Sequence, residues 1–155
     1  MRLRATLLML ATVLAPACAA AQEPPARWPG RPAFGASLDY CSRYVWRGMA
    51  FSGGSVLQPS AAVGYAGFSA SLWGNFVLAD EANRHQFNEV DFTLAYEAGW
   101  GDFTLSPAVQ VYTFPNQQGV PDTGEIAVTL TYALGNFSLF TSQYVDFMEY
   151  DGAYF

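Results

Sequence analysis

The sequence predicts an all-β fold, an antiparallel up-and-down β-barrel that crosses a membrane, and three observations predict it. Hydrophobic residues make up 52% and aromatic residues 16% of the 155 residues, whereas charged residues make up only 13%. No apolar run after the N-terminal leader reaches the roughly 18 residues of a membrane helix. Instead, segments of roughly 10–12 residues alternate between apolar and polar side chains, and the connections between them alternate between long and short, as in outer-membrane barrels.

The N-terminal residues predict export. Arg2 and Arg4 precede an apolar stretch that is too short for an anchor, and Ala19 to Ala21 offer small side chains for cleavage, so residues 1–21 read as a signal peptide. Cys18 leaves lipoprotein processing open as an alternative. Residues 22–35 are expected to form a Pro-rich disordered linker, and residues 36–155 the barrel. Cys41 would then remain as a small inward-facing residue with no internal disulfide.

Alternation divides the strand residues into two rows, because successive side chains of a strand point to opposite faces. Seven strands are expected, at 38–48, 56–66, 68–78, 88–98, 102–113, 125–134 and 137–146. The ring-bearing apolar rows, expected to face lipid, include Tyr40, Tyr44, Trp46, Phe92, Leu94, Tyr96, Val128 and Leu130. The polar rows, expected to line a pore, include Asp39, Arg43, Arg47, Glu89, Asp91, Glu97, Gln110 and Glu125.

The expected strand count is odd, whereas bacterial single-chain barrels have an even number, eight being the usual minimum. Residues 147–155 carry no apolar row for an eighth strand. We therefore expect about seven strands of a barrel that is truncated at the C-terminus. Pro59 and Pro107 fall within expected strands, where each removes a hydrogen bond from the ladder.

A soluble barrel of the lipocalin kind is the alternative, because its strands also alternate. Its apolar rows would face inward and its charged rows outward. The two readings therefore place Phe92, Leu94 and Tyr96 on opposite sides of the sheet, and the structure can distinguish them.

The charge and the reactive residues exclude several functions. The net charge is −6, and removal of Arg2 and Arg4 leaves 5 Arg against 13 acids, or −8, which argues against nucleic acid as a partner. The single His, His85, lies in a polar loop, and no nucleophile elbow is present, so no catalytic residues are expected. Acids near His85 are too scattered to predict a metal site, and no cofactor is expected.

The first expected strand and its surroundings resemble a known family. Tyr40-Cys-Ser-Arg-Tyr-Val-Trp-Arg-Gly48, followed by a loop and Leu57-Gln-Pro59, is similar to the first hairpin of the TorF-type family of bacterial outer-membrane porins. Trp73-Gly-Asn75 and Phe87-Asn-Glu-Val-Asp91 resemble related barrel proteins. The resemblance covers most of residues 38–112 and implies an outer-membrane barrel, but it transfers no catalytic residues. Cys41 departs from the small aliphatic residue that is usual there.

Together these patterns predict a porin-like barrel in the bacterial outer membrane, with membrane lipid and small solutes as its partners. The alternative is a non-conducting structural or adhesion barrel whose loops near Phe51, His85 and Pro115 meet other molecules. The sequence specifies neither the solute nor the oligomeric state.

Overall fold

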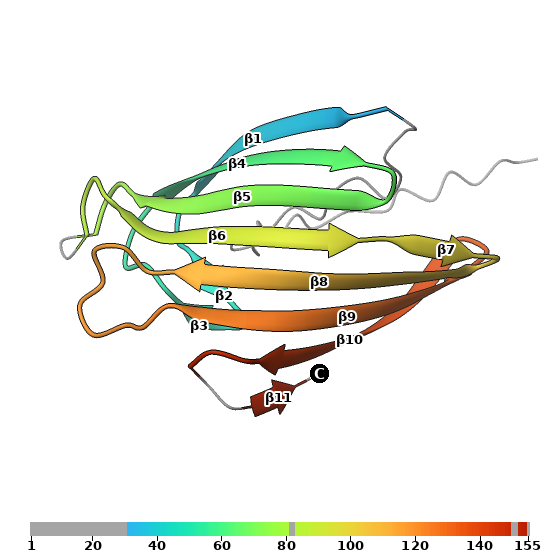
Figure 1. Cartoon of the computed structure of the whole chain (residues 1–155). Helices are drawn as coiled ribbons and strands as arrows, with labels where there is room; N and C mark the ends of the chain where they lie inside the picture. Colours follow the sequence, from blue (N-terminus) through green and yellow to red (C-terminus); the bar gives the residue numbers. More distant parts are fainter. Residues whose placement is uncertain (1–30, 81–82, 150–151, 155) are drawn as a thin grey trace, which may run out of the picture.

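The computed structural model of the chain describes residues 31–80, 83–149 and 152–154, and all regular structure in these ranges is β-strand (Figure 1). The strands are β1 (Ala33–Cys41), β2 (Val45–Trp46), β3 (Met49–Ala50), β4 (Val56–Tyr65), β5 (Phe68–Val77), β6 (Phe87–Tyr96), β7 (Ala98–Trp100), β8 (Phe103–Thr113), β9 (Thr123–Leu134), β10 (Phe137–Asp146) and β11 (Gly152–Tyr154). Within these ranges there is no helix of the length and hydropathy that a membrane crossing requires.

One antiparallel sheet holds all strands except β2 and β3, which pair only with each other. Its order is β1-β4-β5-β6-β8-β9-β10-β11, and β7 continues the line of β6 by pairing with β8. The predicted all-β, antiparallel, up-and-down arrangement is therefore confirmed, with long strands close to the expected ranges. The prediction that residues 147–155 hold no further strand is wrong, because β11 forms there and pairs with β10. The sheet is open, with β1 at one edge and the short β11 at the other, so the structure does not show the closed barrel.

Long and short connections alternate along the chain, as predicted. In Figure 1 the tight turns after β4, β7 and β9 lie at one end of the sheet, and the longer connections before β4, β6 and β9 lie at the other. Ala66 and Gly67 both adopt positive φ angles, 51° and 86°. Such a two-residue turn matches the right-handed twist of the strands it joins.

The predicted first strand is wrong at both ends. Residues 38–48 were expected to be continuous, but β1 ends at Cys41, and the chain then bends away into the small β2–β3 hairpin. The strand also begins earlier than expected, at Ala33, so residues 33–35 of the predicted linker belong to the sheet. The predicted signal peptide and the rest of the linker, up to residue 30, lie outside the described residues.

Both prolines interrupt the ladder without shifting it. The β4–β5 pairing passes from Leu57–Phe76 to Ser60–Trp73 with the same register, so the gap lies at Pro59. The β6–β8 pairing ends at Ala95–Ala108 and resumes with β7 in the same register, so this second gap spans Pro107. Proline has no N–H to donate, so each proline removes one hydrogen bond from the ladder and leaves a local gap in the pairing.

The two faces of the sheet have opposite character. Phe92, Leu94 and Tyr96 remain 53%, 58% and 38% exposed. The opposite face is polar yet covered, since Asn75, Glu89 and Glu125 are 0%, 5% and 5% exposed. The apolar rows therefore do not form an interior core, contrary to the lipocalin-like alternative. We call the covered side the polar face and the exposed side the apolar face.

Candidate functional site

The candidate site is the polar face together with the segment that folds over it, residues 42–55, which we call the inner hairpin. In Figure 1 its strands β2 and β3 lie behind the main sheet at the level of β8 and β9. Arg47 and Gly48 form its tip, with φ angles of 47° and 80°. A two-residue turn with both φ angles positive reverses the chain sharply, and Arg47 adopts it without being glycine.

Aromatic rings hold the inner hairpin against the sheet. Tyr44 is only 1% exposed, and its ring centroid lies 5.6 Å from those of both Phe51 and Trp73. Trp46 contacts Phe51 and, at 6.3 Å, Tyr112 of β8. The expectation that Tyr44 and Trp46 point outward to lipid is therefore wrong. They belong to the hairpin that turns inward, where ring packing of this kind adds to the stabilisation from burial.

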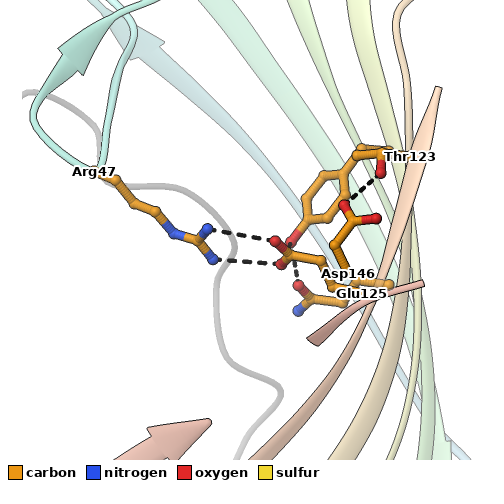
Figure 2. A network of polar contacts seen from close by, with 6 residues as sticks. Arg47, Thr123, Glu125 and Asp146 are labelled. Atoms are coloured by element: carbon orange, nitrogen blue, oxygen red, sulfur yellow. Dashed lines mark hydrogen bonds and ion pairs between the residues drawn. The ribbon is translucent and has the colours of Figure 1, made fainter. Parts of the chain in front are cut away.

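The tip of the inner hairpin is fixed by an ion pair. The Arg47 guanidinium donates two hydrogen bonds to the Glu125 carboxylate of β9, at 3.5 and 3.4 Å (Figure 2). The same guanidinium lies 3.7 Å from the Trp46 ring centroid and 4.9 Å from that of Tyr144. The Tyr112 hydroxyl donates to Glu125 at 3.0 Å and also contacts Gln110 Oε1. This bidentate contact between residues 78 positions apart clamps the hairpin across the polar face.

A second carboxylate orders the end of β10. Thr123 Oγ1 donates to Asp146 Oδ2 at 2.5 Å, as Figure 2 shows, while the backbone N–H groups of Met148 and Glu149 donate to Asp146 Oδ1 at 3.0 and 3.1 Å. Asp146 is 6% exposed. Its oxygens are therefore satisfied by local donors, and its role is structural.

A buried row of side-chain amides crosses three strands. Gln58 Nε2 donates to Asn75 Oδ1 at 2.9 Å, and Asn75 Nδ2 donates to Asn88 Oδ1 at 2.7 Å. Cys41 Sγ lies 3.4 Å from Gln58 Oε1 at one end of the row. Cys41 is buried, as expected, but it is disulfide-bonded, contrary to expectation, and its partner lies outside the described residues. Because buried amides need partners, the row stiffens this end of the sheet.

A β-bulge creates this arrangement on β6. Asn75 pairs with Glu89 but the next residue, Phe76, pairs with Phe87, so Asn88 is the extra residue. Asn88 and Glu89 are both buried although they are neighbours in sequence. Bulges re-aim side chains in this way. Sequence reasoning missed the amide row because a bulge leaves no reliable pattern. The one signal in the sequence is that Gln58 and Asn75 are amides within alternating segments.

The predicted pore-lining residues fall into three groups. Asp39, Glu89, Asp91, Gln110 and Glu125 lie on the polar face, and the register on either side of the β6–β7 gap puts Glu97 there too. Arg47 reaches the face from the inner hairpin. Arg43 lies outside the sheet, exposed in the bend after β1. The pore itself stays a prediction.

Of the residues expected to face lipid, all except Tyr44 and Trp46 lie on the apolar face. Tyr40, Phe92, Leu94, Tyr96, Val128 and Leu130 are all at least 38% exposed. Contact with lipid stays a prediction for these side chains.

Comparison of the chain with protein-family models, with curated proteins and with solved structures finds no match. The resemblance to TorF-type porins therefore stays a prediction that rests on the motifs alone. In the described part of the chain no group of three or more His, Cys, Asp or Glu side chains is placed to hold a metal ion.

Gly54 is expected to be indispensable to the base of the inner hairpin. A Cβ atom there would lie 1.9 Å from the backbone oxygen of Ala79, in a connection fixed by Leu78 and Ala79 N–H bonds to the Ser55 carbonyl. The Gly54→Ala variant should therefore lose roughly 1–3 kcal/mol of stability, because backbone must shift to admit a methyl group. The measurement is urea unfolding of the purified protein.

Gly35→Ala is the matched control, since a Cβ at Gly35 meets nothing within 4 Å. Equal unfolding midpoints for the two variants would contradict the close packing of the hairpin base.

Proposed function

We propose that the chain is a porin-like β-barrel protein of the bacterial outer membrane that allows passive diffusion of small solutes. The observation that carries this proposal is the inverted polarity of the sheet, with apolar rows exposed and polar rows covered. A soluble sandwich or barrel buries its apolar rows, whereas a barrel in lipid turns them outward and keeps polar side chains in its lumen. The closed transmembrane form, to which this chain contributes seven long strands, is part of the same proposal.

Rings on the apolar face gather near both ends of the strands. Towards the short turns, the ring centroids of Phe68 and Tyr96 are 4.6 Å apart, and those of Phe103 and Tyr132 are 4.7 Å apart. Towards the long connections, the ring centroids of Phe76 and Phe87 are 5.2 Å apart. Aliphatic side chains such as Leu72 and Leu94 occupy positions between these ends and are 43% and 58% exposed. Aromatic belts on either side of an aliphatic band support the proposal that the strands cross a membrane.

The strand length supports the same proposal. The long strands other than β1 span 10 to 12 residues. A tilted transmembrane strand needs about 9–11 residues, whereas strands of globular proteins are most often about 5–6 residues long.

The inner hairpin favours a second candidate, a non-conducting outer-membrane barrel that meets partners through its loops. The Arg47–Glu125 clamp and the buried aromatic rings place a folded segment across the polar face. In a narrow barrel such a segment would block the lumen; in a wider one it would only narrow it. The two candidates therefore differ in whether ions pass.

Conductance across a planar bilayer separates the two candidates. The full chain, purified in detergent and reconstituted, should produce discrete current steps in 1 M KCl if it forms a porin. Folded insertion is checked independently by protection of the strands from added protease. Protected protein that passes no current would contradict the porin proposal and favour the non-conducting barrel.

A further inference from the structure

We propose that Glu89 and Asp91 bind a hard, partly hydrated divalent cation, of the Ca²⁺ or Mg²⁺ type, on the polar face beneath the inner hairpin. The two carboxylates are two residues apart on β6, so they lie on the same face of one strand. Asn75 and Trp73 of β5 are their cross-strand partners, and Tyr112 of β8 lies opposite Asp91. The site is therefore built on neighbouring strands of the sheet.

Each carboxylate has one oxygen that lacks a partner. Among the described residues, Glu89 Oε2 and Asp91 Oδ1 are the buried side-chain oxygens that make no hydrogen bond. Glu89 is 5% exposed, and its carboxylate accepts a hydrogen bond from the Tyr44 hydroxyl of the inner hairpin. Buried polar atoms without a partner are costly, and each one points to a ligand, a water or an ion that completes it.

Within residues 31–80 and 83–149, neither Glu89 nor Asp91 forms an ion pair with an arginine. The ion pair found in the described part of the chain joins Arg47 to Glu125, while Arg43 and Arg84 are exposed. The polar face is acidic along its whole length, since its carboxylates are those of Asp39, Glu89, Asp91, Glu97, Glu125 and Asp146. A bound cation would offset the free-energy cost of removing the two carboxylates from water.

The chemistry of the donors indicates which cations fit. Carboxylate oxygens are hard ligands that favour Mg²⁺ and Ca²⁺ over softer transition metals. Mg²⁺ usually keeps several of its waters and binds proteins through only one or two carboxylates. The site therefore needs no third protein ligand.

Terbium ion is the probe, because it binds hard oxygen ligands as Ca²⁺ does and luminesces when a nearby aromatic ring is excited. Trp73 lies directly opposite Asp91 and would act as the antenna. Titration of the folded full chain with Tb³⁺ should give saturable luminescence that both Ca²⁺ and Mg²⁺ displace. The Glu89→Gln, Asp91→Asn double variant should lose the saturable signal. Asp102→Asn, which removes an exposed carboxylate in the β7–β8 turn, should keep it.

The Trp73→Phe variant tests the location. It should retain Tb³⁺ binding, measured by equilibrium dialysis, but lose much of the luminescence that selective excitation of tryptophan produces. Circular dichroism of each variant checks that the sheet is retained. Unchanged Tb³⁺ binding in a folded double variant, or absence of saturable binding in the wild-type protein, would overturn the site.

The site has a consequence for transport that rests on the proposed porin function. The reconstituted protein should pass cations in preference to anions, seen as a reversal potential in a KCl gradient, and the double variant should lose part of that preference. Tb³⁺ binding without current would refute the porin and retain the site. Current with no Tb³⁺ binding would refute the site and retain the porin.

Discussion

Replacement of Arg47 with alanine is expected to release the inner hairpin from the polar face and to raise the single-channel conductance of the reconstituted protein. The Arg47 side chain is 34% exposed and that of Glu125 only 7%. Loss of the guanidinium therefore leaves the Glu125 carboxylate buried without its ion-pair partner. Removal of one member of a buried pair leaves an uncompensated charge and costs about 3–5 kcal/mol. The partial exposure of Arg47 lowers this to roughly 1–3 kcal/mol, because solvent screens the pair.

Arg47→Lys is the matched variant. Like the wild-type arginine, lysine is positively charged and must adopt the positive φ angle at position 47. Lysine cannot, however, reproduce the two parallel hydrogen bonds to Glu125. Its effect on conductance and stability should therefore lie between those of the wild type and Arg47→Ala. A double-mutant cycle with Glu125→Gln should give a coupling free energy of roughly 0.5–3 kcal/mol. Additive effects, with conductance unchanged in Arg47→Ala, would mean that the clamp does not hold the hairpin.

The outer rows of the sheet were predictable from sequence because they depend only on local alternation. A strand with period two separates Phe92 and Leu94 from Asp91 and Thr93 whatever its neighbours are. The tight turns at Ala66–Gly67 and Gly135–Asn136 fixed the register of two hairpins in the same way. These predictions needed no knowledge of long-range contacts.

The inner hairpin could not be predicted in the same way, because residues 42–47 continue the alternation of β1. A hairpin and a straight strand give the same pattern there until the turn at Arg47–Gly48 is known. What favours the inward fold is distant in sequence: the Trp73 and Tyr112 rings and the Glu125 carboxylate all follow the hairpin in the chain. The bulge at Asn88 escaped prediction for a related reason, since it is defined by pairing with β5.

Introduction of arginine at Leu94 should be the most damaging single change on the apolar face if that face meets lipid. Leu94 is 58% exposed, and its cross-strand partners on β5 and β8 are Ala70 and Val109. An arginine facing lipid near the middle of a bilayer costs about 2–4 kcal/mol, whereas an exposed substitution in water usually changes stability by less than about 0.5 kcal/mol. The free energy of unfolding, measured by urea titration in phospholipid vesicles, should therefore fall sharply in Leu94→Arg.

Ser138→Arg provides the control, because Ser138 is also exposed but shares the polar face of β10 with Ala133 of β9 as its partner. There the new charge would lie on the side of the sheet turned away from lipid, and stability should change little. A large loss for Leu94→Arg beside a small loss for Ser138→Arg is the pattern that lipid contact requires. Equal, small losses would show that water covers both faces, and the inverted polarity of this sheet would then need a different partner from the membrane.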